Sequence, residues 1–246
     1  MFIQMREKRM THGLVIAAMA CLIPSIASAG IVIDDFTNDT SLAPWLAPQT
    51  TVGSSWIIDS NLTGAIKTTR LTTLAASFIG NPNFDAITPT LDTVNGELSY
   101  QSTLGADGGI AMSYGQVGAP ITLDLSSESG LQLDFSSIVF GGQGAANLGF
   151  GAGIQVTTLI SDGVNSAIGS RGLIIEGAQS VAFDFNNFSS IASVDLTNIK
   201  LVAFQVDTAF GTDFVMTQFS TFVVPAPGGL MVMGMMGMFG SRRRRK

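Results

Sequence analysis

Apolar residues alternate with polar ones along most of this chain, and this period of two restricts its fold more than any other feature. "ITLDL" (121–125) and "LQLDF" (131–135) each place every second residue on one face, as a half-buried β-strand does. The five residues "SSESG" between them suit a hairpin loop. No stretch between Gly30 and Phe222 sustains a helical period, so the pattern predicts an all-β domain.

Other segments extend the strand pattern. "SVAFDFNNF" (180–188) alternates in the same way. "NIKLVAFQVD" (198–207) is apolar on both faces from Ile199 to Val206, which is typical of a central strand in a two-layer core. The remaining strand candidates are "IVIDDF" (31–36), "SSWII" (54–58), "ELSYQST" (97–103), "GIAMSY" (109–114), "IQVTTLI" (154–160), "GLIIE" (172–176) and "DFVMTQFSTF" (213–222).

Turn dipeptides separate several of these segments, namely Asn95-Gly96, Asp107-Gly108 and Asp162-Gly163. About ten to twelve short strands at this spacing predict an antiparallel, jelly-roll-like β-sandwich. A β-solenoid is the alternative, but the sequence shows no repeat of fixed length.

The distribution of charge argues against a nucleic-acid partner. Residues 30–222 hold 17 acidic and 4 basic residues, a net charge of −13, whereas the whole chain has −6. Binding to phosphate groups requires a basic surface. We therefore expect no nucleic acid to bind this segment.

The first 29 residues have the three parts of a secretory signal peptide. "REKR" (6–9) is the basic part, residues 13–24 are apolar, and Ala27 and Ala29 place small side chains before Gly30, as signal peptidase requires. The twelve apolar residues would cover about 18 Å as a helix, less than the ~30 Å hydrocarbon core of a membrane. We predict export and cleavage before Gly30, with an uncleaved anchor or a lipoprotein as alternatives.

This cleavage removes Cys21 and His12, the only cysteine and the only histidine. The exported body then lacks the side chains for a disulfide, a thiolate nucleophile, a Ser/His/Asp triad or a His/Cys zinc site. Its 17 acids can be paired for glycoside hydrolysis in many ways, and no pair stands out. We therefore expect a protein that is not an enzyme, with a glycan-active enzyme as a remote alternative.

Asp34 and Asp35, together with Asp213, are the candidate ligands for a structural Ca²⁺. No loop dense in aspartate supports them. Calcium therefore remains an option, and we expect no other metal or cofactor.

Four large rings are available to stack on a sugar: Trp45, Trp56, Tyr100 and Tyr114. Trp56 and Tyr100 lie in apolar strand patterns, so core packing is the favoured role for both. The threonines of "TTRLTTLAAS" (68–77) suggest an ice-binding ladder. A single short stretch lacks the repeated rows of such a face, so ice binding is a remote alternative.

The end of the chain combines a proline motif, an apolar run and a basic cluster. Residues 228–240 are 13 uncharged residues, about 20 Å of helix. The basic cluster consists of Arg242, Arg243, Arg244, Arg245 and Lys246. Because basic residues stay on the cytoplasmic side of a membrane, this order predicts a short C-terminal transmembrane helix that holds the exported body at the membrane.

The proline motif, with the run and cluster that follow it, resembles the C-terminal sorting signal of the PEP-CTERM family. It consists of Val224, Pro225, Ala226, Pro227 and Gly228. The family motif is Val-Pro-Glu-Pro, so Ala226 replaces its glutamate, and the sequence resembles a Val-Pro-Ala-Pro-Gly variant. The resemblance implies recognition by an exosortase-type membrane enzyme and a final location at the bacterial cell surface or in the extracellular matrix. An ordinary single-span anchor is the alternative.

A second resemblance concerns the body. "LDLSSESGLQLDF" (123–135), "FDFNNF" (183–188) and "VDLTNIKLVAFQVD" (194–207) resemble the strand order of jelly-roll domains of the galactose-binding or carbohydrate-binding-module type. This likeness covers about residues 121–222 and implies a sandwich able to bind extracellular polysaccharide.

These patterns divide the chain into a signal peptide (1–29), a β-sandwich (30–222) and a sorting or anchor segment (223–246). The leading interpretation is a non-catalytic surface or matrix protein. A carbohydrate-binding module is the alternative.

Overall fold

The structure is a computed structural model that describes residues 30–37, 45–46, 50–53, 55–63, 66, 68–115, 120–141 and 153–224. For residues 45–46, 55–63 and 69 it describes the backbone only. The segment Ala29–Val224 forms a compact unit. The predicted signal helix and C-terminal helix lie outside the described residues.

The described residues of this unit include thirteen strands. They are β1 (Val32–Asp34), β2 (Trp45–Leu46), β3 (Ser55–Thr63), β4 (Thr69–Ile79), β5 (Ile87–Asp92), β6 (Glu97–Ser102), β7 (Ala106–Tyr114), β8 (Gly130–Val139), β9 (Ile154–Ser161), β10 (Ser166–Leu173), β11 (Gln179–Asp184), β12 (Leu201–Thr208) and β13 (Asp213–Phe222). Three short 3₁₀ helices, η3 (Phe185–Asn187), η4 (Ile191–Ser193) and η5 (Leu196–Asn198), lie between β11 and β12.

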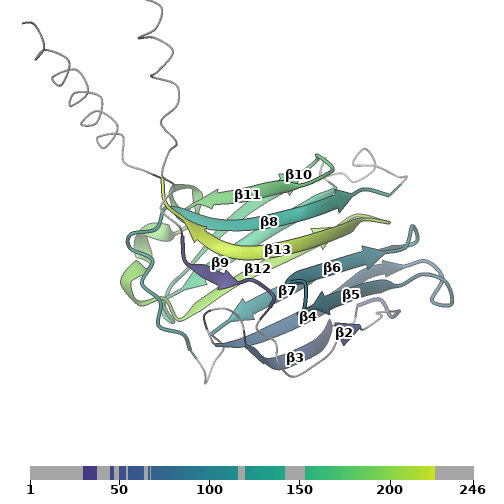
Figure 1. Ribbon diagram of the computed structural model, residues 1–246, viewed down its shortest axis with the longest axis horizontal. Coiled ribbons are helices and arrows are strands. Elements are labelled where there is room, and N and C mark those ends of the chain that lie inside the picture. Colours follow the sequence, from purple (N-terminus) through teal and green to yellow (C-terminus); the bar gives the residue numbers. More distant parts are fainter. Residues whose placement is uncertain are drawn as a thin grey trace, which may run out of the picture. The chain divides into compact units, whose positions relative to one another are not determined.

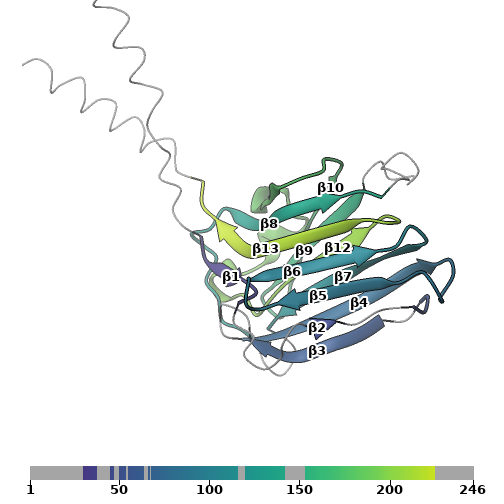
Figure 2. The same ribbon diagram turned by 45° about the vertical axis from the view of Figure 1, so that its right-hand side comes forward.

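The strands form two stacked sheets (Figures 1 and 2). The seven-stranded sheet has the order β11-β8-β13-β6-β5-β2, with β1 paired to β13, and the six-stranded sheet has the order β10-β9-β12-β7-β4-β3. Every pairing between strands is antiparallel. The prediction of an all-β antiparallel sandwich is therefore confirmed.

The core lies between the inner faces of the two sheets. In β12, for example, Val202, Phe204 and Val206 are buried, while the residues between them point outward. Phe204 packs edge-to-face on Phe219 of β13, with ring centroids 5.0 Å apart. Contacts of this kind join the sheets by burying apolar area on both sides of the interface.

A buried ion pair also joins the two sheets. Asp34 of β1 accepts a 2.5 Å bond from the Arg70 guanidinium of β4 and a 2.6 Å bond from the Tyr114 hydroxyl of β7. All three side chains are fully buried, and the Arg70 guanidinium lies 5.9 Å from the centre of the Phe36 ring. The partners of the Asp34 carboxylate thus tie the first strand of one sheet to two strands of the other.

Two predicted strands and one predicted hairpin are wrong. Residues 121–125 form no strand beside β8; the backbone of Leu123 instead exchanges hydrogen bonds with Ile199, an isolated bridge. The segment 172–176 leaves the sheet after Leu173, where β10 ends, and Ile174 and Ile175 are exposed.

Two other predictions need correction. "SVAFDFNNF" is a strand only as far as Asp184, which caps η3 by accepting the Asn186 N–H. Asp107-Gly108 is no turn but part of β7. A Cβ at Gly108 would lie 2.2 Å from the Ala75 carbonyl oxygen, so the glycine is needed for the close approach of β4 and not for a turn.

Among the described residues, no helix is long and apolar enough to cross a membrane. The predicted spans at both ends of the chain fall outside that part of the protein.

Candidate functional site

An open groove of about 290 Å³ lies on the outer face of the six-stranded sheet. Its lining comes from β4, β7, β12, β9 and β10, and includes Leu71, Thr73, Ala111, Ser113, Thr157, Leu159, Ile168, Ala203 and Gln205. All of these residues are partly exposed. They belong to the face that the sandwich core does not use.

Strand register places five of these residues in one row across the sheet. Leu71 of β4 lies opposite Ser113 of β7, which lies opposite Ala203 of β12; the row continues through Leu159 of β9 to Ile168 of β10. The row is apolar except for Ser113. Its central members are small and its outer members are large, so the surface is lowest over β7 and β12.

A second row runs beside the first and is mostly polar. It contains Thr73, Ala111, Gln205, Thr157 and Ser170 in the same strand order. The hydroxyls of Thr157 and Ser170 lie 3.0 Å apart and share a hydrogen bond. The groove therefore has an aliphatic side and a hydroxyl and amide side, both running across the strands.

Three polar side chains of the groove have no hydrogen bond with any other described residue: Thr73, Ser113 and Gln205. Water satisfies such groups at a surface, and a ligand hydroxyl replaces that water readily. These three side chains offer both donors and acceptors.

Two carboxylates lie next to the groove on the same face. Asp207 follows Gln205 by two residues on β12, a separation of about 7 Å along the strand. Its partner in β7 is Gly109, and Asp107 precedes Gly109 by two residues, so the two aspartates are diagonal neighbours.

The two carboxyl groups share a partly desolvated environment. Burial and the neighbouring Asp207 carboxylate raise the pKa of Asp107 to about 6. Burial also raises the pKa of Asp207. Burial acts because water solvates a charge here less well than on an open surface, and at Asp107 repulsion by the Asp207 charge adds to it.

Phe78 provides an aromatic ring at this end of the face. It is the partner of Asp107 in the pairing of β4 with β7, and 47% of its surface is exposed. Its ring meets Phe210 edge-to-face at 5.3 Å.

Two of the residues predicted to direct export and sorting are described. Gly30 packs so closely on β13 that a Cβ would lie 1.9 Å from the Thr221 carbonyl oxygen. Val224 is exposed, and its N–H donates to Ser129 Oγ at 2.8 Å. The others lie outside the described residues: Ala27, Ala29, Pro225, Ala226, Pro227, Gly228, Arg242, Arg243, Arg244, Arg245 and Lys246.

The three acids proposed as calcium ligands do not form one site. The carboxylate of Asp34 binds Arg70 and Tyr114. Asp34 pairs with Phe219 of β13. Asp213 lies six residues farther along the same strand, a separation of about 20 Å. Within the described ranges, no group of three or more His, Cys, Asp or Glu residues is placed to hold a metal ion.

The core packing favoured for Tyr100 is confirmed, and Tyr114 is likewise not an exposed sugar-stacking ring. Tyr100 and Tyr114 are fully buried, and Tyr100 stacks on Phe214 with ring centroids 5.0 Å apart. Trp45 and Trp56 lie in β2 and β3, but their side chains lie outside the described part of the chain. Thr72 of the proposed ice-binding stretch is buried in the core, and Thr73 lines the groove.

The groove was not predicted from the sequence. The sequence feature that comes nearest to indicating it is the segment from Ile199 to Val206, which is apolar on both faces. Both faces were predicted to lie in the core. One of them, represented by Ala203, lies in the groove instead.

Comparison with protein-family models and with curated proteins finds no match. Among solved structures, the chain is similar to a family 11 carbohydrate-binding module from Clostridium thermocellum in complex with a β-1,3-1,4-mixed-linked tetrasaccharide. The identity is 16%, the match covers 79% of this chain and 95% of that one, and the TM-score is 0.36.

Two further structures show the same level of likeness. The family 11 module of a cellulosomal cellulase of Clostridium thermocellum is 16% identical, with 81% of this chain and 98% of that chain covered and a TM-score of 0.37. An exo-β-agarase is 14% identical over 80% of this chain and 26% of that chain, with a TM-score of 0.37. At this level of similarity, the neighbours' ligands and activities do not transfer to this chain.

Proposed function

We propose that the body of this protein binds an extended polysaccharide in the groove of the six-stranded sheet. The observation that carries the proposal is the pairing of an aliphatic row with a hydroxyl and amide row in one open groove. A sugar ring likewise has apolar C–H faces and polar hydroxyl edges. The groove therefore offers complementary contacts to both parts of a glycan.

The form of the groove favours a polymer over a small, enclosed ligand. Apart from the buried Met112 and Phe204, the residues that line it are partly open to solvent, so a bound chain can extend beyond them. Contacts of modest strength, repeated over several sugar units, give useful affinity without a deep pocket.

A direct test is a binding screen with the full chain in mild detergent. Laminarin, mixed-linkage β-glucan, xylan and agarose are suitable neutral polymers, and affinity electrophoresis measures retardation by each. We expect at least one to retard the protein. If none does, the proposal fails.

A substitution that fills the groove then tests whether the polysaccharide binds there. Ala203→Trp places a large ring over the lowest part of the groove and is expected to weaken binding at least tenfold, about 1.4 kcal/mol. Ala182→Trp is the matched control, because Ala182 is exposed on β11 in the other sheet. Equal binding by the two variants would place the ligand elsewhere.

We also propose that the protein is exported and held by its C-terminal segment before processing. Support comes from the signal-like residues 1–29 and the proline, apolar and basic elements of 224–246. The close packing of Gly30 on Thr221 is compatible with a folded body that starts at that residue. N-terminal sequencing of envelope material should give Gly30, and a start at Met1 or a lipidated Cys21 would contradict export with this cleavage.

The tail has its own test. Replacing Arg242–Lys246 with serines is expected to release uncut body, because the 13 uncharged residues before the cluster are barely long enough to hold a helix in the membrane. Replacing Pro225 and Pro227 with alanines is expected to leave the protein membrane-held and uncut. Fractionation with an antibody to the body distinguishes these outcomes, and parental behaviour of both variants would refute a sorting role.

A further inference from the structure

The charge around the groove narrows the class of polysaccharide that it accepts. On the outer face of the six-stranded sheet, the charged side chains among the described residues are Asp107 and Asp207. Both adjoin the groove on the strands that form its floor. No positive charge on this face offsets them within the described ranges.

The basic residues of the described body are placed elsewhere. Arg70 is buried in the core with Asp34. Arg171 donates to the Ala182 carbonyl of β11, in the opposite sheet. Lys200 donates to Thr122 Oγ1 just before β12 begins.

We infer that the groove accepts uncharged glycan chains and rejects acidic ones, because Asp107 and Asp207 repel a carboxylated or sulfated polymer laid along β7 and β12. This inference rests on the proposed function and adds a chemical class to it. Like charges brought together at an interface weaken binding and exclude the wrong partner. The body's net charge of −13 also repels acidic polymers. The experiment therefore has to distinguish repulsion by Asp107 and Asp207 from repulsion by the total charge.

The test compares each neutral polymer with its own carboxymethylated derivative. Laminarin, mixed-linkage β-glucan, xylan and agarose provide four such pairs, and the full chain is used at low ionic strength. For each pair, the measured quantity is the ratio of the dissociation constant for the acidic polymer to that for the neutral one. We expect this ratio to be at least ten for every neutral polymer that binds.

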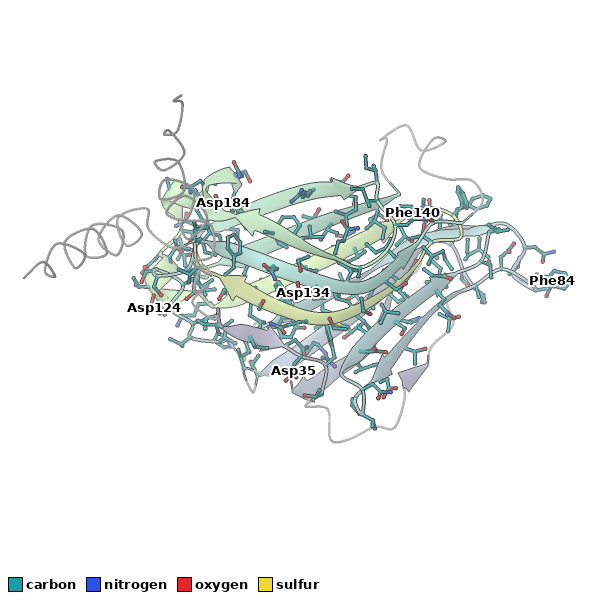
Figure 3. All side chains as sticks on the ribbon, turned by 45° about the horizontal axis from the view of Figure 1, so that its top comes forward. Asp35, Phe84, Asp124, Asp134, Phe140 and Asp184 are labelled. Atoms are coloured by element: carbon teal, nitrogen blue, oxygen red, sulfur yellow. The ribbon has the colours of Figure 1, made fainter. Side chains whose placement is uncertain are left out.

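The double variant Asp107→Asn/Asp207→Asn should lower the ratio to about three or less, because it removes the charges beside the groove. The control Glu97→Gln/Asp134→Asn removes the same amount of charge from the outer face of the seven-stranded sheet, where Figure 3 labels Asp134. It should leave the ratio at ten or above. If the ratio falls equally in both double variants, the total charge of the body excludes acidic polymers, and the inference is wrong.

Salt gives an independent measurement on the unmodified protein. At 0.5 M NaCl the Debye length falls to about 4 Å, shorter than the 7 Å or so between Asp207 and Gln205 along β12. The ratio should therefore approach one, and a ratio that stays above ten would point to steric exclusion instead. Binding of neutral and acidic polymers with equal affinity at low salt refutes the inference alone, whereas failure of all four neutral polymers to bind refutes the proposed function.

Discussion

The outer faces of the two sheets differ in the side chains that they present to solvent. On the seven-stranded sheet, Thr90, Ser99, Val215 and Ser137 form a row across four strands. The corresponding row on the six-stranded sheet is Leu71, Ser113, Ala203, Leu159 and Ile168. Of these two rows, only the second has large aliphatic residues on both sides of small ones, and the groove lies over it.

A second apolar face on a strand therefore does not require a second layer of protein. Leu201 and Ala203 on the outer face of β12 are half-buried by their neighbours in the same sheet. Contiguous apolar surface that faces solvent often marks a binding site. The seven-stranded face is therefore the internal control for every experiment on the groove.

The largest expected effect comes from breaking the ion pair that joins the two sheets. Arg70→Met leaves the Asp34 carboxylate buried without its cationic partner, which should reduce the free energy of unfolding by about 3–5 kcal/mol. Urea denaturation measures this. Adding Asp34→Asn should restore part of the loss, because the buried charge is then gone; no recovery would show that the pair is not the source of the effect.

A smaller effect is expected when one hydrogen-bonding group is removed from the groove. Gln205→Ala should weaken binding of the retained polysaccharide about fivefold, or roughly 1 kcal/mol, the net value of one hydrogen bond. Gln101→Ala is the matched control, because Gln101 is exposed on the outer face of β6. Titration calorimetry of both variants tests the difference between the faces, and equal losses would contradict it.

The smallest expected effect concerns the stability of the acidic end of the six-stranded face. The pKa of Asp107 is about 6 in the folded protein, against about 3.9 in an unfolded chain. The folded state therefore favours the protonated carboxyl, and stability falls as the pH rises from about 4 to about 6. Because the group is partly exposed, Asp107→Asn should gain only about 0.5–1 kcal/mol at pH 7.5, and none below about pH 4.

Thermal unfolding across this pH range measures the gain. Asp134→Asn, on the seven-stranded face, removes one charge from the other side of the sandwich and serves as the comparison. A gain for Asp107→Asn that persists at pH 3.5 would show that something other than its ionisation is responsible.

Much of the fold could be predicted because alternation reports which residues of a strand face the core. Leu131, Leu133 and Phe135 were assigned to one face of a strand, and all three are buried. Alternation also misled in one place. Leu123 and Leu125 alternate as in a strand, yet they do not pair with β8. The backbone of Leu123 bonds to Ile199, just after η5, and the Leu125 N–H donates to the carbonyl of Leu196 in η5.

The groove could not be predicted because it depends on register between strands far apart in the sequence. Ser113 and Ala203 become neighbours only when β7 pairs with β12. Leu71 joins them from β4, a strand that sequence analysis treated as a possible ice-binding stretch. Asp107 was predicted to lie in a turn, so its position beside Asp207 on one face of the sheet could not be predicted.

The most direct test of the account is to locate the bound polysaccharide by NMR. With methyl-labelled alanine, Ala111 and Ala203 report on the groove, and Ala182 reports on the outer face of the seven-stranded sheet. Titration with the polymer that binds best should shift the signals of Ala111 and Ala203 and leave that of Ala182 unchanged. A shift at Ala182 without one at Ala111 and Ala203, or binding that moves none of the three, would contradict the assignment of binding to the six-stranded face.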